Sequence, residues 1–207
     1  MSEEKPEVIF EDPNDFYTLE ETNRYENNSG MKKTQTELTN IILQLYFQER
    51  KEVDISILDV GCGTGFSLEF LKQNNFNKLI GIDPAREMQT ICKKKGFESY
   101  LGGFLEIPRE IKDKRFDLII SVSALQWILT NKQEMEIKNI VKKIGSNFKS
   151  LLKENGIVIL QYYPPTKDLH DTLISSFQRA GLNTSSYIYN EGNLKKQKYF
   201  LILKSKS

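Results

Sequence analysis

Residues 57–65 read ILDVGCGTG, and this stretch decides the fold of the 207-residue chain. Its first half is a short apolar run, which is typical of a buried strand. Gly61, Gly63 and Gly65 stand at every second position after that run and lead into the helical pattern FSLEFLKQN. Glycine permits a tight turn and lets a ligand approach the backbone closely. The stretch therefore predicts a strand, a turn that can bind a ligand, and a helix.

The glycine spacing and two carboxylates indicate the kind of ligand. The spacing is not that of a dinucleotide turn or a phosphate loop, because no G-x-G-x-x-G and no Gly-Lys-Ser/Thr is present. Asp59 precedes the glycines, where it would repel a pyrophosphate but suit the ammonium of an amino acid. Asp83 ends the run KLIGID, at the place where a carboxylate meets ribose hydroxyls in a doubly wound sheet. S-adenosylmethionine has a ribose and a cationic aminoacyl end and carries no phosphate. Two alternatives stay open: a turn without a ligand, and an Asp83 that only caps the next helix.

Outward from this stretch, short apolar runs alternate with helical patterns, and the chain closes on an antiparallel hairpin. Repeated strand–helix units of this kind predict an α/β fold with a mostly parallel sheet and helices on both faces. The expected strands are 55–60, 78–83, 98–103, 115–123, 157–163, 185–190 and 196–204, and the expected helices are 33–49, 66–74, 84–96, 136–156 and 168–181.

Composition excludes several classes of protein. Charged residues make up 28% and the formal net charge is +1, so any basic surface must be local. No run of eighteen apolar residues and no signal peptide is present, so we expect an intracellular protein without a membrane span. Cys62 and Cys92 are too few for a disulfide framework or a four-cysteine zinc site, and no metal site is expected. The single histidine, His170, lies in the helical pattern DLHDTL, and we expect it at the surface of that helix.

The motifs resemble those of the class I S-adenosylmethionine-dependent methyltransferases. ILDVGCGTG corresponds to their first motif, GIDPA to their second, and RFDLIISVSALQWIL to their continuation after the fourth strand. The resemblance implies a Rossmann-like, seven-stranded methyltransferase domain over residues 33–207, with residues 1–32 as an arm that folds over the cofactor site. The implied cofactor-binding residues are Tyr25, Asp59, Gly61, Cys62, Gly63, Gly65, Asp83, Pro84, Met88, Gly103, Phe104 and Ser121.

Three further stretches resemble the eukaryotic small-subunit (18S) rRNA guanine-N7 methyltransferases of ribosome biogenesis. They are the arm KPEVIFEDPNDFYTLEETNRYENNSG, the segment SVSALQW, and LQYYP together with KKQKYFLILKS. The resemblance implies methylation of a guanine N7, which carries a free lone pair and loses no proton, so no general base is needed. Trp127, Gln126 and Tyr162, with Tyr163 beside it, follow strands four and five, and they are the residues expected to stack on the base or read its edge. For Gln126 we expect donation to the guanine O6.

The resemblance also implies a partner and a location. The family pairs with a small zinc-ribbon methyltransferase activator, and the exposed edge of the third strand near Tyr100 and Leu101 is the expected contact. A pre-ribosomal particle would be the substrate, in the nucleus and cytoplasm. Gly102 and Gly30 replace an aspartate and an arginine of the family, which would weaken cofactor binding. The family's basic C-terminal tail has no counterpart before Ser207, which puts nuclear targeting in doubt.

Three other functions remain to be weighed against this one. The near-neutral charge also suits a methyltransferase that acts on a small molecule or a lipid. The replacements Gly102 and Gly30 suit a ribosome-assembly factor whose catalysis is dispensable. A nicotinamide dehydrogenase does not fit the glycine spacing.

Overall fold

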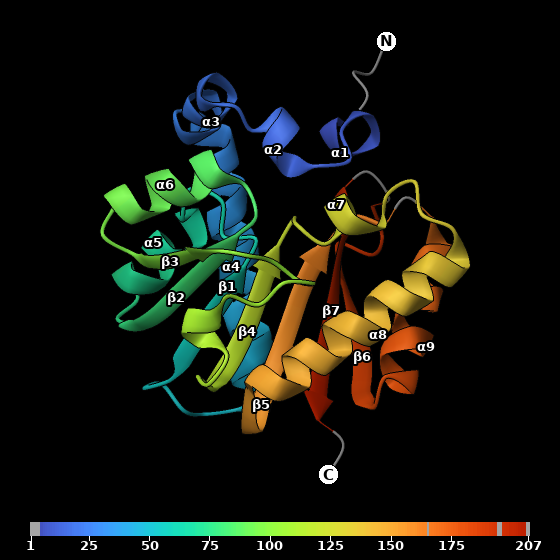
Figure 1. Cartoon of the computed structure of the whole chain (residues 1–207). Coiled ribbons are helices and arrows are strands. Elements are labelled where there is room, and N and C mark those ends of the chain that lie inside the picture. Colours follow the sequence, from blue (N-terminus) through green and yellow to red (C-terminus); the bar gives the residue numbers. More distant parts are fainter. Residues whose placement is uncertain (1–4, 165, 194–195, 206–207) are drawn as a thin grey trace.

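A computed structural model describes residues 5–164, 166–193 and 196–205. A seven-stranded sheet in the order β3-β2-β1-β4-β5-β7-β6 runs through the molecule (Figure 1). Strands β1 to β5 are parallel, and β7 pairs antiparallel with both β5 and β6. The predicted fold class is confirmed. The strands are β1 (Ser56–Val60), β2 (Lys78–Asp83), β3 (Glu98–Leu101), β4 (Phe116–Val122), β5 (Leu152–Tyr162), β6 (Leu182–Tyr189) and β7 (Lys198–Ser205).

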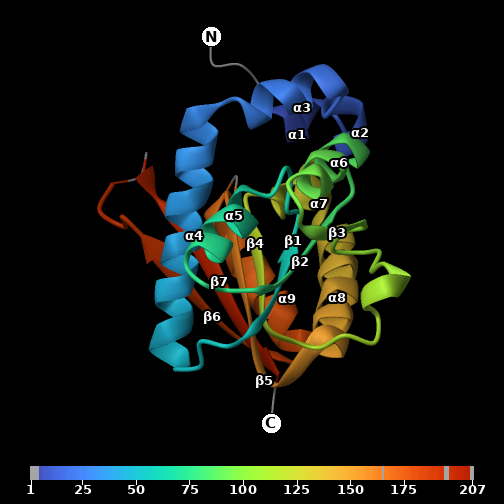
Figure 2. The same ribbon diagram turned by 90° about the vertical axis from the view of Figure 1, so that its left-hand side faces the viewer.

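Helices cover both faces of the sheet and make two separate apolar cores (Figure 2). One core lies under α4 and α5 and contains Ile42 and Leu68, and the other lies under α8 and α9 and contains Val141 and Phe177. Both cores meet at the sheet because its central strands are apolar on both sides, as a parallel sheet requires. The helices of the body are α4 (Ser29–Glu49), α5 (Phe66–Gln73), α6 (Arg86–Lys94), α7 (Gln126–Leu129), α8 (Glu134–Leu151) and α9 (Lys167–Arg179), with a short 3₁₀ turn, η1 (Arg109–Ile111).

Two helix boundaries differ from the sequence-based expectation. Helix α4 begins at Ser29 instead of residue 33, because the Asn28 side chain accepts the Met31 N–H at 3.0 Å and caps it. Helix α8 ends at Leu151, although a helix was expected to continue to Gly156. Leu152 is already extended and pairs with Phe116 of β4, so the exposed residues that follow it belong to strand β5.

The N-terminal arm, residues 5–28, consists of three short helices above the carboxyl edge of the sheet (Figures 1 and 2). They are α1 (Pro6–Ile9), α2 (Pro13–Phe16) and α3 (Leu19–Glu26), and proline opens the first two. Asn14 ties α2 to the body, because its side chain donates to the Pro84 carbonyl and accepts from the Arg86 N–H. Lys95 of the body pairs with Glu26 of α3 at 2.6 Å. Residues 1–4, 165, 194–195 and 206–207 lie outside the described residues.

Strand β3 forms one edge of the sheet, as expected, and Leu101 at its end is 45% exposed. An edge strand has unpaired backbone N–H and C=O groups along its outer side. No helix in the described part of the chain is long and apolar enough to cross a membrane.

Candidate active site

A cavity of about 1850 Å³ lies between the carboxyl edge of the sheet and the N-terminal arm. The glycine turn after β1, the ends of β2 and β3, and the segments that follow β4 and β5 form its floor and walls. Helices α1 to α3 form its roof. Ligands of parallel α/β sheets bind at this edge, because loops from several strands converge there.

The glycine turn is held open by backbone geometry and by β2. Gly61 has φ of +78°, and a Cβ there would lie 2.3 Å from the Cβ of Ala124, so no other residue fits. The Gly61 N–H donates to the Ile82 carbonyl at 2.8 Å. Gly63 carries no side chain at the cavity wall, and the Tyr25 ring and the Met88 sulfur lie 4.0 Å from where its Cβ would be. The turn therefore presents bare backbone to the cavity.

Asp83 holds the glycine turn and opens helix α6 at the same time. One of its carboxylate oxygens accepts the Gly63 N–H at 2.7 Å and the other accepts the Ala85 N–H at 2.8 Å. Burial raises the pKa of Asp83 to about 6, and these two N–H groups oppose that shift. Asp83 lines the cavity and each oxygen has a second lone pair, so it can also accept hydrogen bonds from ribose hydroxyls. Asp83 thus holds the residue that precedes α6, and its binding to a ribose stays a prediction that is compatible with this structural role.

Asp59 lies one layer below the cavity. It is 1% exposed, does not line the cavity, and neither carboxylate oxygen has a hydrogen-bond partner among the described residues. Burial, and the neighbouring Cys92 and Asp83, raise the pKa of Asp59 well above its usual value. An unpartnered buried carboxylate at this place fits a cationic group of a ligand, as the sequence indicated.

The loop after β3 is where an adenine ring would be expected. Pro84, Met88, Gly103 and Phe104 all line the cavity there. The Gly103 N–H already donates to the Glu106 carbonyl, so it is not available to a ligand. The Phe104 carbonyl accepts from Asn147 and keeps a second lone pair. The Phe104 N–H has no acceptor among the described residues.

Gly102 is required by this loop. A Cβ at Gly102 would lie 2.7 Å from the Glu106 carbonyl oxygen and from Pro108. The aspartate found in the related family therefore cannot be accommodated in this loop conformation. Glycine at position 102 is therefore a requirement of this loop conformation.

Aromatic rings of the arm close the middle of the cavity. Tyr25 stacks on Phe66, with ring centroids 5.4 Å apart, above the glycine turn. The ring centroid of Trp127 lies 5.5 Å from that of Tyr17 and 6.0 Å from that of Phe16. Tyr17 and Phe16 were not among the predicted site residues, although their presence in a polar arm was the signal that the arm folds.

The segments that follow β4 and β5 line the part of the cavity where the methyl acceptor is expected, which we call the acceptor side; it includes Gln126, Trp127 and Tyr163. Gln126 places a side-chain amide there. The Gln126 amide N–H donates to the Ser123 carbonyl at 2.8 Å, and its carbonyl oxygen is buried without a partner among the described residues. Ser123 has φ of +56° and donates its hydroxyl to Gln161. Gln126 lines the cavity as expected, but its free group is an acceptor and not the donor that the sequence suggested.

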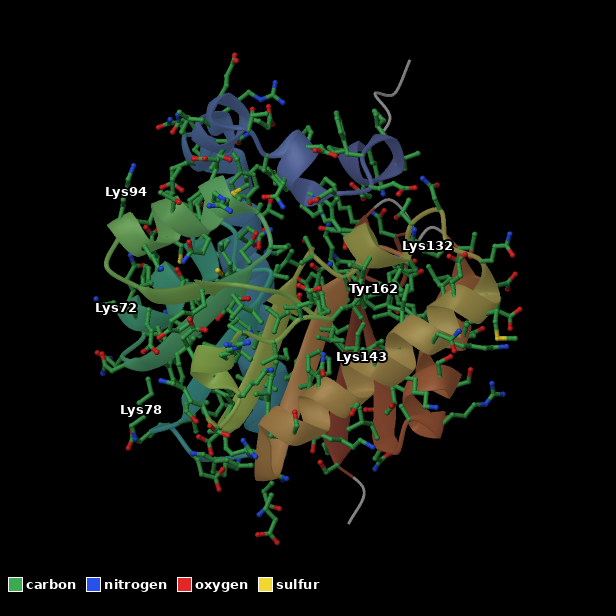
Figure 3. All side chains as sticks on the ribbon, viewed as in Figure 1. Lys72, Lys78, Lys94, Lys132, Lys143 and Tyr162 are labelled. Atoms are coloured by element: carbon green, nitrogen blue, oxygen red, sulfur yellow. The ribbon has the colours of Figure 1, made fainter. Side chains whose placement is uncertain are left out.

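Tyr162 lies in the core, where Figure 3 labels it, and not in the cavity. It is fully buried, and its hydroxyl is hydrogen-bonded to Nδ1 of His170. His170 is itself 4% exposed, so the expectation of a surface histidine is wrong. Burial lowers the pKa of His170 and favours the neutral ring. Tyr163, which follows Tyr162 directly after β5, lines the cavity in place of Tyr162.

Three more of the predicted residues lie at or just behind the cavity wall. Gly65 begins α5 with φ of +92°, and Ser121 is buried within β4; neither lines the cavity. Cys62 lines it, and its thiol lies 4.0 Å from that of Cys92 with no disulfide between them.

Comparison with known proteins agrees with this geometry. Residues 58–160 match the family described as a methyltransferase domain. The fold resembles that of magnesium protoporphyrin IX methyltransferase from Synechocystis, crystallised with S-adenosylmethionine, with a TM-score of 0.68 and 11% identity over 100% of both chains. The fold of the PH0226 protein from Pyrococcus horikoshii is similar too, with a TM-score of 0.62 over 89% of this chain and 99% of that one, at 15% identity.

The strand order, the glycine turn after β1 and the buried Asp83 after β2 define the class: the chain is a class I S-adenosylmethionine-dependent methyltransferase. Within this class it resembles the eukaryotic 18S rRNA (guanine-N(7))-methyltransferases over nearly its whole length. It is 25% identical to the Schizosaccharomyces pombe enzyme over 93% of this chain and 72% of that one. It is 29% identical to the Bos taurus enzyme over 92% of this chain and 68% of that one.

Proposed function

We propose that the protein transfers a methyl group from S-adenosylmethionine to N7 of a guanine in small-subunit ribosomal RNA. The similarity to 18S rRNA (guanine-N(7))-methyltransferases spans the arm, the methyltransferase motifs and the C-terminal hairpin. The acceptor side of the cavity carries this proposal, because it offers an indole, a phenol and a free amide oxygen. The chain's one imidazole is buried under Tyr162 and is not a base in the cavity.

The described residues fit S-adenosylmethionine, which supplies an electrophilic methyl group on a sulfonium. We assign the ribose to Asp83, the methionine end to the glycine turn above Asp59, and the adenine to the Phe104 N–H between Pro84 and Met88. Tyr25, which the arm places over Gly63, excludes water from the methionine end. The guanine N7 attacks with its own lone pair, so the chain needs to position the base and exclude water without removing a proton.

Gln126 distinguishes guanine from adenine in this proposal. Its free carbonyl oxygen accepts a hydrogen bond from the guanine N1–H or the exocyclic amino group. Adenine has an unprotonated N1 and no 2-amino group, so it offers no donor at the two positions that the Gln126 oxygen contacts on guanine. The ring of Trp127 stacks on the base, as aromatic side chains do with splayed-out bases.

Labelled methyl transfer tests the reaction. The protein, with a zinc-ribbon methyltransferase activator, is incubated with tritiated S-adenosylmethionine and either an 18S rRNA transcript or the same transcript with 7-deazaguanine in place of guanine. We expect label in the first and none in the second, because 7-deazaguanine lacks the attacked nitrogen. Equal labelling of both, or labelling only of a small-molecule or lipid extract, would exclude this function. A protein that binds the cofactor tightly and labels none of these would be an assembly factor.

We further propose that this activator binds the edge of β3, as the family resemblance implies. Leu101, which is 45% exposed, ends β3, whose outer side has no partner strand among the described residues. Leu105, which is 36% exposed, lies in the loop that follows β3. An edge strand binds another strand through its free backbone groups. Co-expression should raise the soluble yield and cofactor affinity, and Leu101→Glu should break the complex while Leu19→Glu, at an exposed leucine of the arm, should not. A monodisperse chain that binds cofactor equally well alone would exclude the partner.

The substrate also suggests a location. A methyltransferase of pre-ribosomal particles acts in the nucleus and travels with the particle to the cytoplasm. Imaging of the tagged protein should show both pools, and a purely membrane-associated signal would contradict the proposal.

A further inference from the structure

Two lysine ammonium groups lie close to the Tyr163 ring, at the end of β5. The Lys198 ammonium lies 4.7 Å from the centre of the Tyr163 ring and donates to its hydroxyl at 3.1 Å. The Lys5 ammonium lies 5.8 Å from the same ring centre. Tyr163 and Lys5 both line the cavity, and Lys198, which is partly exposed, lies beside Tyr163 next to the cavity lining.

Three different elements bring these residues together. Tyr163 directly follows β5, and Lys198 begins β7, where the register Tyr162↔Tyr199 places the two residues opposite each other. Lys5 is the residue that precedes the first turn of α1, and Asn131 fixes that helix by donating to the Val8 carbonyl at 3.0 Å. The cluster is therefore built by the sheet and the arm together.

The positive charges of Lys5 and Lys198 are not neutralised by carboxylates of the described residues. Neither Lys5 nor Lys198 forms an ion pair with a carboxylate of the described residues, whereas Lys32, Lys95 and Lys204 each do. Tyr163 is half-buried, so part of its ring is accessible from the cavity. An aromatic ring flanked by unpaired ammonium groups is the chemistry that binds single-stranded nucleic acid, since the ring stacks on a base and the cations neutralise phosphates.

Resting on the proposed function, we infer that Tyr163, Lys198 and Lys5 form a binding site for a nucleotide next to the methylated guanine in single-stranded RNA. One base stacks on the Tyr163 ring, and the phosphates on either side of it lie against the two ammonium groups. Tyr163 and Lys5 line the same cavity as Trp127 and Gln126, and we assign them to the neighbouring nucleotide and not to the reacting base. It also supplies local positive charge to a protein whose net charge is only +1.

The test measures RNA binding and cofactor binding separately in the full chain. The RNA probe is a fluorescent, single-stranded oligonucleotide of mixed sequence, and cofactor affinity is measured by calorimetry. Tyr163→Ala should weaken RNA binding about tenfold or more, whereas Tyr163→Phe should stay close to wild type because it retains the ring. Lys198→Gln should make the salt dependence of binding shallower by about 0.7 in log–log slope, and the Lys5→Gln/Lys198→Gln double variant by about twice that. Cofactor affinity should not change in any of them.

Lys72→Gln is the matched control. Lys72 also lies over an aromatic ring, 5.6 Å from the centre of Phe97, but on α5, and it does not line the cavity (Figure 3). Its substitution should leave both affinities and the salt slope unchanged.

The outcomes separate this site from the proposed reaction. If the wild-type protein methylates rRNA but the Tyr163 and Lys198 variants bind RNA like Lys72→Gln, the site is wrong and the reaction stands. If RNA binding depends on these residues but no guanine is methylated, the site stands and the reaction is wrong. A wild-type protein that does not bind the oligonucleotide, or a Tyr163→Ala variant that loses cofactor affinity to the same extent, overturns the site.

Discussion

Asp83 connects cofactor binding to pH. Its pKa in the folded protein is about 6, against an ordinary value of 3.8, because the carboxyl is buried. Ribose hydroxyls donate to the ionised form, so cofactor affinity should be highest above pH 6 and fall by up to about tenfold per pH unit below it. Calorimetric titration with S-adenosylmethionine between pH 5 and 8 measures this, and Asp83→Asn should bind much more weakly with that pH dependence removed.

The same group has the opposite effect on the stability of the protein without cofactor. A raised folded pKa means that the contribution of Asp83 to stability is present below pH 3.8 and is lost as the pH rises through about 6. The difference in unfolding free energy between wild type and Asp83→Asn should therefore shift against the wild type over this range. If stability and affinity rise together with pH, Asp83 does not titrate as described.

Alanine substitutions at two glycines with positive φ distinguish the cost of backbone strain from the cost of a steric clash. Gly61→Ala places a Cβ 2.3 Å from Ala124, whereas Gly96→Ala, also at positive φ, meets no atom within 4 Å. Gly96→Ala should cost only the strain of a left-handed conformation, about 1–2 kcal/mol. Gly61→Ala should cost that amount and roughly 1–3 kcal/mol more from overpacking, and it should abolish cofactor binding. Chemical denaturation measures both, and equal losses would show that the contact with Ala124 can relax.

At this scale, the sequence identified the cofactor side of the site better than the acceptor side. Asp83, Gly61 and Gly63 follow from a motif whose spacing reflects backbone geometry. Tyr162 and Tyr163 are adjacent and chemically alike, so only the direction of alternation along β5 decides which one enters the core. Tyr162 enters the core because its hydroxyl finds a hydrogen-bond partner there in His170 of α9, a contact that the local sequence does not reveal.

Among the elements, the N-terminal arm roofs the cavity, and Asn14 ties it to the body of the protein. Asn14 makes two hydrogen bonds to the residues that follow β2, at 3.1 Å each. Asn14→Ala should loosen α2 and weaken S-adenosylmethionine binding about three- to tenfold, because each such bond contributes roughly 0.5–1.5 kcal/mol. Asn77→Ala, at an exposed asparagine that bonds only to its neighbour Asn75, is the control. Equal affinities in the two variants would mean that the arm closes without this clamp.

Element boundaries were predicted where local signals are strong. The run KLIGID coincides with β2, and the glycine after β1 fixes the start of α5. The end of α8 was misplaced because Asn155-Gly156 resembles a helix stop, whereas pairing of Leu152 with Phe116 ends the helix at Leu151, five residues before the expected end. Long-range strand pairing overrides a local signal of this kind.

At the scale of the whole molecule, the sheet with its two cores, the N-terminal arm and the end of β5 each form a different part of the structure around the cavity. The cores on both faces of the sheet make the methyltransferase body, the arm roofs the cavity, and Tyr163 after β5 lines the cavity. The alternating pattern predicted this body, since it depends on periodicity and short connections. How the arm packs and which lysines stay unpaired depend on contacts far apart in sequence, which periodicity does not report.

Identification of the methylated nucleoside tests the central claim most directly. The protein with its activator and S-adenosylmethionine is incubated with small-subunit ribosomal particles or their RNA, and the RNA is digested to nucleosides for mass spectrometry against synthetic standards. We predict 7-methylguanosine among the nucleosides, and its absence in the Asp83→Asn reaction. A methyl group on another atom or another base, or no methylated nucleoside from a protein that binds the cofactor, would contradict the claim.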